Sequence, residues 1–162
     1  MLPLLLFTIS VLPTADQAPV VVASMSSNSS VHGVWPVRPA EVISGFDPPA
    51  ANWDSGHRGI DLATSTGIVV MSAADGIVTF ANSLAGRGVV VVDHGSVRTT
   101  YEPVHATVAA GDWVSTGDEL GTIETGTGHC GDGSCLHWGL RRDDNYLDPR
   151  LLLGLRPVLK AP

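Results

Sequence analysis

The sequence predicts an all-β domain, built as an antiparallel β-sandwich or barrel-like sheet of short strands with a short C-terminal helical turn. Three observations favour this fold class. The chain has 18 Gly and 11 Pro among its 162 residues, which indicates many turns. Short apolar runs rich in Val and Ile alternate with these turn residues at intervals of roughly ten positions. No stretch of helical periodicity precedes the C-terminal region.

The predicted elements can be placed along the chain from these runs. A first strand and turn is expected within residues 35–46, and a loop through Asp47, Pro48 and Pro49 then leads to His57. At the other end, residues 148–154 predict a capped helical turn whose leucines pack on the sheet. The strands expected between these ends cover residues 68–71, 76–81, 89–93, 98–101, 113–114, 120–123 and 136–140.

Length and composition indicate a single domain, because 162 residues that are 44% hydrophobic can enclose one core. We expect a signal-like leader at 1–23, a Ser-rich flexible tether at 24–34, the domain at 35–155 and a tail at 156–162. The apolar run at 2–11 is too short to span a membrane. Because no Lys or Arg precedes this run, an atypical signal, an upstream start and a disordered N-terminus are alternative interpretations.

The net charge of −7 and the pI near 5.1 argue against nucleic acid as a partner. A nucleic-acid surface needs a basic stripe that neutralises phosphates, and the sequence contains none. The same acidity gives no help in binding anionic wall polymers, so attachment to such a surface would depend on local contacts in a groove.

The two cysteines, Cys130 and Cys135, are five positions apart, with a Gly-rich segment between them. As a metal pair, this spacing is longer than that of a zinc knuckle, and no second pair accompanies it. As a disulfide in an exported protein, the flexible segment allows closure. The disulfide is the favoured interpretation, and the metal pair is the alternative.

Three residues form the most convincing set of metal ligands. His57 and Asp61 have an even spacing, which places both side chains on one face of an extended strand. Downstream, strand periodicity places His137 on one face with Cys135 and Gly139, while Trp138 faces the core. Two imidazoles and a carboxylate suit zinc and leave the fourth tetrahedral position open for water, whereas a purely structural zinc site would be closed by a fourth residue.

The motifs around these residues follow an order that resembles one peptidase family. The blocks lie between about residues 35 and 153, and they resemble the lysostaphin/LytM-type zinc metallopeptidases of family M23. They are His-Arg-Gly-Ile-Asp-Leu (57–62), Ala-Asp-Gly-Ile-Val (74–78), Gly-Arg-Gly-Val-Val-Val-Val-Asp-His-Gly (86–95), Thr-Thr-Tyr (99–101), Val-Ala-Ala-Gly-Asp-Trp-Val (108–114), Gly-Asp-Glu-Leu-Gly (117–121) and Leu-His-Trp-Gly (136–139).

The resemblance implies a complete ligand set and an incomplete set of catalytic histidines. His57, Asp61 and His137 match the family's zinc ligands, and His137 is the second His of a His-x-His motif. The first His is replaced by Cys135, and the His of a Tyr-x-His-Leu motif is replaced by Pro103. General acid–base assistance is typically worth about 10²- to 10⁴-fold, so these replacements leave catalytic competence open.

Several nearby residues are candidates to substitute for the two missing histidines. His129 could offer an imidazole to the vacant side of the site if a disulfide holds it close to the strand of His137, and a plain loop histidine is the alternative. Glu102 is expected to point away from Pro103 and to be a solvated carboxylate. Of the other histidines, His105 has the weakest support as a substitute and His94 is expected to be structural.

Three functions from different classes follow. The first is a secreted or cell-wall-associated bacterial zinc endopeptidase, acting as a monomer on stem or cross-bridge peptides of peptidoglycan. The second is a catalytically degenerate LytM-like module that binds the wall or regulates a partner hydrolase. The third is a β-rich interaction domain without metal. Metal content and peptide cleavage separate these three hypotheses.

Overall fold

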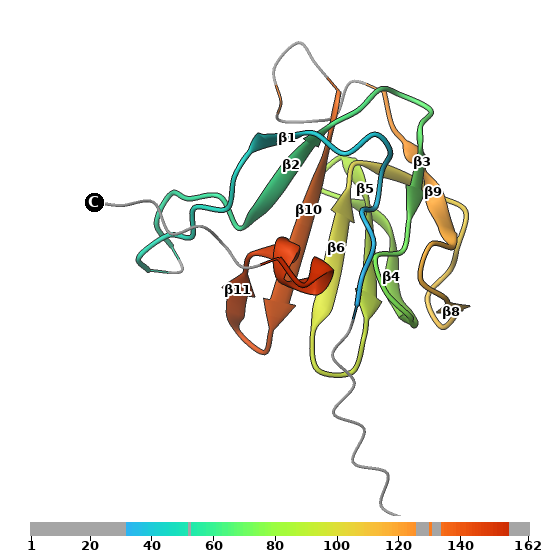
Figure 1. The fold of residues 1–162 in the computed structure, drawn as a ribbon. Coiled ribbons are helices and arrows are strands. Elements are labelled where there is room, and N and C mark those ends of the chain that lie inside the picture. Colours follow the sequence, from blue (N-terminus) through green and yellow to red (C-terminus); the bar gives the residue numbers. More distant parts are fainter. Residues whose placement is uncertain (1–31, 52, 126–129, 131–133, 156–162) are drawn as a thin grey trace, which may run out of the picture.

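A computed structural model describes residues 32–51, 53–125, 130 and 134–155. Nearly every element in these residues is a strand (Figure 1). The elements are β1 (Val42–Ser44), β2 (Gly59–Ala63), β3 (Val69–Met71), β4 (Gly76–Leu84), β5 (Arg87–Asp93), β6 (Arg98–Glu102), β7 (Val104–Ala106), β8 (Trp113–Val114), β9 (Glu119–Ile123), β10 (Cys135–Arg142), β11 (Asn145–Leu147) and the 3₁₀ helix η1 (Pro149–Leu153).

The strands form two antiparallel sheets. The larger sheet has the order β1-β2-β10-β6-β5-β4-β8, and β11 adds to β10 beside this path. The smaller sheet has the order β3-β9-β7. In the larger sheet β10 lies between β2 and β6, so the strand that carries His137 is central, as Figure 1 shows.

The core lies on one face of the larger sheet and is completed by the smaller sheet. On β10 the alternate residues Leu136, Trp138 and Leu140 are buried in it. The ring of Trp35 packs on Trp138, with ring centroids 5.9 Å apart. Leu152 of η1 covers the same core. Strand alternation therefore turns His137 to the opposite face of the sheet.

The predicted fold class is confirmed, and the main differences concern strand length. β4 continues to Leu84, beyond the predicted end at residue 81, because it forms a hairpin with β5. The tight turn uses Ala85 and Gly86, both with positive φ. Asn82 and Ser83 are tolerated in this strand because its outer end is solvent-exposed. The short strands β7 and β11 had no signal of their own in the sequence.

The described part of the chain begins just before the predicted domain boundary. The amide of Gly33 donates to the carbonyl of Leu152, and that of Val34 donates to the carbonyl of Ala73. The predicted leader, most of the predicted tether and the predicted tail lie outside the described residues. Within the described residues, no helix has the length and apolar character that crossing a membrane requires.

Candidate metal centre

The pairing of β2 with β10 brings the predicted ligands together across 76 positions of sequence. Asp61 is the direct partner of His137 in this antiparallel pair, and directly opposed residues share a face. His57 precedes β2 and is held by an isolated bridge to Asp47, with backbone hydrogen bonds of 2.7 and 3.0 Å. All three side chains therefore lie on the face of the sheet opposite the core.

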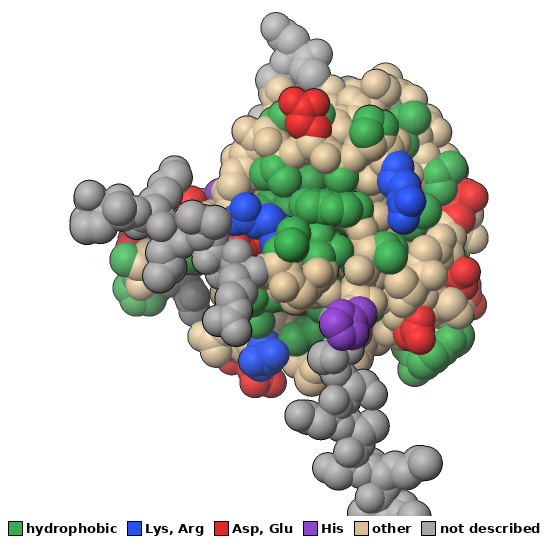
Figure 2. Space-filling view, viewed as in Figure 1, with side chains coloured by type: hydrophobic (Ala, Val, Ile, Leu, Met, Phe, Trp, Pro, Cys, Tyr) green, Lys and Arg blue, Asp and Glu red, His purple; other side chains and the backbone are tan. Residues whose placement is uncertain are grey.

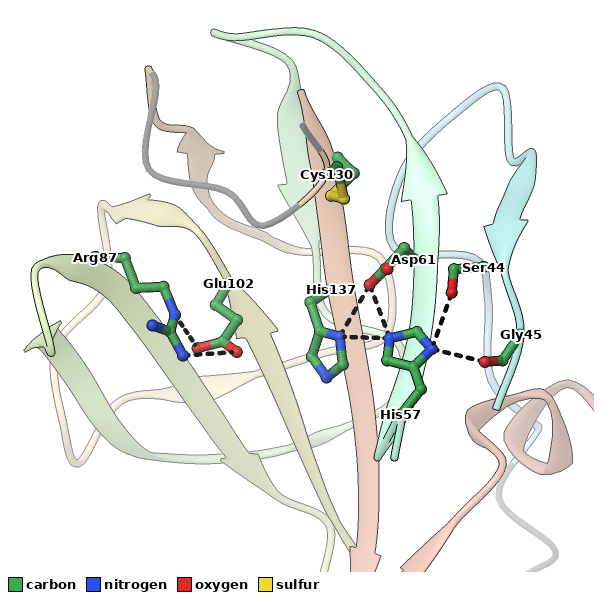
Figure 3. A network of polar contacts seen from close by, with 9 residues as sticks. Ser44, Gly45, His57, Asp61, Arg87, Glu102, Cys130 and His137 are labelled. Carbon is green, nitrogen blue, oxygen red and sulfur yellow. Dashed lines mark hydrogen bonds and ion pairs between the residues drawn. A yellow bond between two sulfur atoms is a disulfide. The ribbon is translucent and has the colours of Figure 1, made fainter. Parts of the chain in front are cut away.

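Three polar atoms converge at this point, as Figure 3 shows. Oδ1 of Asp61 lies 3.0 Å from Nε2 of His57 and 2.9 Å from Nδ1 of His137. The two imidazole nitrogens are 3.1 Å apart. Asp61 is 4% exposed, so this carboxylate is removed from bulk water. A buried carboxylate between two imidazoles needs a positive partner, either protons or a cation.

The second nitrogen of His57 fixes the ring. Nδ1 lies 2.6 Å from the carbonyl oxygen of Gly45 and 3.2 Å from the hydroxyl of Ser44. A carbonyl oxygen only accepts, so Nδ1 carries the proton and Nε2 presents a lone pair toward Asp61 and His137. A hydrogen bond from the outer nitrogen to a carbonyl is the usual support of a metal-binding histidine.

The triangle of atoms fits zinc. Tetrahedral zinc with bonds of about 2.0–2.1 Å has ligand atoms roughly 3.3 Å apart, and the observed edges are only slightly shorter. These three residues form one of the groups able to hold a metal ion among the described residues. A triangle of three ligands leaves one tetrahedral position for water or substrate.

A glycine makes room for the ring of His137. A Cβ at position 59 would lie 2.7 Å from Nε2 of His137 and 2.5 Å from the carbonyl oxygen of Trp138. Any side chain at this position would displace the imidazole or separate β2 from β10. Gly59 is therefore part of the site, although it supplies no ligand.

The predicted disulfide between Cys130 and Cys135 is present, with the two Cα atoms 6.1 Å apart. Its sulfur atoms and a carboxylate oxygen of Asp61 lie within 4.8 Å of one another, so the bond lies beside the three candidate ligands. The metal-pair interpretation of the cysteines is wrong for this structure, because both sulfurs are bonded to each other. A loop of this size contributes about 2 kcal/mol by chain entropy.

The expectation of a solvated Glu102 is wrong. Glu102 is the direct partner of His137 on the other side of β10, so it shares the face of the metal centre. Its side chain is 16% exposed and forms a two-pronged ion pair with Arg87, with distances of 2.9 and 3.3 Å (Figure 3). Pro103 follows β6 and is buried. The sequence could not reveal this placement because it does not specify strand register.

The other histidines lie in different surroundings. His105 is exposed on β7 in the smaller sheet. His94 bonds the carbonyl of Asp75 through Nδ1 and the hydroxyl of Thr99 through Nε2, both at 2.8 Å, which agrees with a structural role. His129, the predicted substitute base, lies outside the described residues.

Comparison with known proteins identifies the family. A model of peptidase family M23 matches residues 55–149, a range that contains all three candidate ligands. The chain belongs to peptidase family M23. The resemblance seen in the sequence is thereby confirmed.

Relatives of this M23 chain include a protein of Mycobacterium tuberculosis described as uncharacterized, which is 42% identical over 134 residues. The alignment covers 79% of this chain and 54% of that protein, so the chain spans about half the length of the curated relatives it matches.

Solved structures give the same fold. A zinc-containing peptidase from Vibrio cholerae is 26% identical with a TM-score of 0.60, over 78% of this chain and 40% of the other. Lysostaphin, at 22% identity, has a TM-score of 0.62 over 76% of this chain and 54% of the other, which shows the fold alone.

Proposed function

We propose that this M23 domain is a zinc-dependent endopeptidase that hydrolyses stem or cross-bridge peptides of bacterial peptidoglycan outside the cytoplasm. The observation that carries the proposal is the convergence of His57, Asp61 and His137 within 3.1 Å of one another on an open face of the sheet. Family membership and the fit of these atoms to a tetrahedral zinc face support it.

The bound zinc would polarise a peptide carbonyl and lower the pKa of a water molecule toward neutrality. The residues of the chain determine where the ion, and therefore this chemistry, would be placed. Asp61 and the two imidazoles would hold the ion on one side, and the carbonyl of Gly45 would keep the lone pair of His57 directed at it. Because the ligands come from two neighbouring strands, their positions are fixed by the β2–β10 ladder.

Hydrolysis also requires proton transfers, and the imidazoles expected to assist them are replaced in this chain by Cys135 and Pro103. The disulfide sulfur of Cys135 has no proton to exchange, and the buried ring of Pro103 has none either. We expect hydrolysis to be slower than with positioned imidazoles by about 10²- to 10⁴-fold, because the contributions of groups that act as a unit do not add.

These replacements favour a second candidate function. A degenerate M23 module would retain zinc and bind wall peptides or a partner hydrolase without cutting. The acidic net charge does not favour electrostatic attachment to anionic polymers. The face of the molecule shown in Figure 2 also does not favour such attachment, because its basic side chains are scattered singly among acidic and hydrophobic ones. Contacts in a groove would have to supply the binding.

Two measurements on the purified chain test the proposal. Zinc content is expected to be close to one equivalent at neutral pH and to fall below about a tenth in His57→Ala. Release of peptides from purified peptidoglycan is expected for the parent chain and not for His57→Ala. His105→Ala is the matched control, because this histidine is exposed outside the site.

Each outcome has one interpretation. One equivalent of zinc without any cleavage would support the degenerate module. Less than a tenth of an equivalent in the parent chain would contradict both zinc-dependent functions. Cleavage that survives His57→Ala would come from a contaminant.

A further inference from the structure

Asp61 belongs to two groups of side chains whose ligand atoms lie close enough together to hold one metal ion. The first group is the candidate metal centre, with His57 and His137. The second joins Asp61 to Cys130 and Cys135, and its ligand atoms lie within 4.8 Å of one another. Because both groups share one buried carboxylate, an ion bound to Asp61 at the candidate centre would lie beside the disulfide (Figure 3).

The register of β2 and β10 places Cys135 at the side of the candidate centre. Cys135 pairs with Ala63 and His137 pairs with Asp61, so Cys135 and His137 are successive positions on one face of β10. Such positions are about 7 Å apart along a strand. The side chain of Cys135 therefore starts one strand step away from the candidate ligand His137.

The sulfur of Cys135 can cover the remaining distance by rotation. Sulfur and oxygen ligands of one tetrahedral zinc ion are roughly 3.5 Å apart, given bonds of about 2.3 and 2.0 Å. The separation from Asp61, at most 4.8 Å, exceeds this value by roughly 1 Å. A change of rotamer about the Cα–Cβ bond moves a sulfur atom by roughly 3 Å, which is more than enough.

The disulfide prevents this coordination. The sulfurs of Cys130 and Cys135 are bonded to each other, whereas the form of cysteine that binds zinc is the thiolate. With the bond intact, the candidate centre has three protein ligands, and its fourth position is open for water or substrate. Breaking the bond would add a potential fourth ligand to the site.

The two cysteines differ in their access to a reductant. Cys135 is 1% exposed, whereas Cys130 is only partly buried. A thiol from solution therefore attacks the sulfur of Cys130, and the sulfur of Cys135 leaves with the electron pair of the broken bond. The leaving sulfur is removed from water and close to the carboxylate of Asp61, so its negative charge needs a positive partner. A zinc ion at the candidate centre would be that partner.

We propose that Cys135 becomes the fourth zinc ligand when the disulfide is reduced, and that this closes the metal centre. The inference rests on zinc binding as given in the proposed function, and it adds a redox control of the same site. Four protein ligands, namely two imidazoles, a carboxylate and a thiolate, make the closed arrangement of a structural zinc site. Hydrolysis stops in this form because no position is left for water, and oxidation to the disulfide reopens the site.

A dithiol is the reductant that balances the reaction. Its first sulfur forms a bond to the sulfur of Cys130 and expels Cys135 as a thiolate. Its second sulfur then attacks the first, which releases Cys130 and closes a disulfide within the reductant. Two electrons pass from the dithiol to the two cysteines. Of the two protons that the dithiol loses, Cys130 takes one and solvent takes the other, because the sulfur of Cys135 is bound to zinc.

The test is X-ray absorption at the zinc edge, recorded on the full chain with and without a phosphine reductant. A phosphine is used because the thiolates of a dithiol also bind zinc, and it ends as a phosphine oxide with an oxygen atom from water. The disulfide-bonded chain is expected to show only nitrogen and oxygen neighbours. The reduced chain is expected to gain one sulfur neighbour at about 2.3 Å and to lose the exchangeable water.

A matched pair of variants identifies the sulfur. Cys130→Ser and Cys135→Ser both remove the disulfide and both keep one thiol, so they differ only in which sulfur remains. With the phosphine present, the sulfur neighbour is expected in Cys130→Ser and not in Cys135→Ser. The dispersion of amide signals in NMR spectra verifies that each variant is folded. The reduced parent chain gives the same information without any substitution.

The outcomes separate this inference from the proposed function. Only nitrogen and oxygen neighbours in both the reduced parent chain and Cys130→Ser would overturn it, as would a sulfur neighbour in Cys135→Ser. If the disulfide-bonded chain binds zinc and no sulfur neighbour appears after reduction, the redox control is wrong and the peptidase function stands. A disulfide-bonded chain that binds no zinc would contradict the proposed function, and this inference with it.

Discussion

At the level of single residues, the candidate site depends on atoms beyond the three candidate ligands. The carbonyl of Gly45 sets the tautomer of His57, and the missing side chain of Gly59 gives His137 its position. Neither residue has ionisable chemistry, so a search of the sequence for catalytic residue types does not find them. Their contributions are visible only once the backbone of β1 and β2 is in place.

His94 gives a residue-level prediction on pH. Burial lowers the pKa of this imidazole below its ordinary value, although the nearby Asp75 carbonyl and the carboxylates of Asp93 and Asp75 oppose the shift. The unfolded chain therefore binds a proton more readily than the folded chain does. The stability linked to His94 is full above about pH 6.5 and decreases as the pH falls through that value.

The test compares thermal unfolding at pH 7.5 and pH 5.5 in the parent chain and in His94→Gln. We expect the parent to lose more stability on acidification than the variant, whose amide does not titrate. His105→Gln is the control, since His105 is exposed. An equal loss in the parent and in His94→Gln would show that this group does not contribute.

At the level of elements, the β2–β10 pair is the unit that builds the site. Its register sets Asp61 against His137 and Gly59 against Gly139. The same strand pair therefore provides two of the candidate ligands and the room for an imidazole. Because these features share one ladder, a change that separates the two strands should affect all of them together.

Gly59→Ala tests this dependence. The new Cβ would lie within 2.7 Å of both the His137 imidazole and the Trp138 carbonyl, so we expect a loss of about 1–3 kcal/mol of stability and weaker zinc binding. Gly139→Ala meets only ordinary contacts and should unfold at an equal or higher temperature, because alanine loses less entropy in a strand. Equal melting temperatures and zinc affinities for both variants would contradict the account.

At the level of the whole molecule, the larger sheet separates stability from chemistry. Its inner face buries the core with the smaller sheet and η1, while its outer face carries the three candidate ligands. The candidate ligands come from distant parts of the sequence, so we expect metal binding to require the folded state. Zinc should then stabilise the whole domain through mass action.

Metal removal tests this coupling. At a free zinc concentration 100-fold above the dissociation constant, a single site adds about 2.7 kcal/mol to the stability of the folded state. We expect a chelator to lower the melting temperature of the parent chain and to leave Asp61→Asn unchanged. A chelator effect of the same size in both proteins would show that zinc binds elsewhere.

The sequence predicted the class of fold, which is confirmed, and three metal ligands, which remain a prediction, for different physical reasons. Alternating Val and Ile runs between turn residues specify strands locally, and the motif order around His57 and His137 indicated the family. The positions of Glu102 opposite His137 and of Tyr146 opposite Arg141 depend on which strands pair and in which register. Register is a long-range property, and single-chain patterns of period two do not encode it.

X-ray absorption at the zinc edge tests the central claim most directly. For the zinc-loaded parent chain we expect only nitrogen and oxygen neighbours at about 2.0–2.2 Å, from His57, Asp61, His137 and one exchangeable water. The disulfide should keep Cys130 and Cys135 out of the coordination shell. A sulfur neighbour at about 2.3 Å, or a spectrum unaltered in Asp61→Asn, would contradict the account.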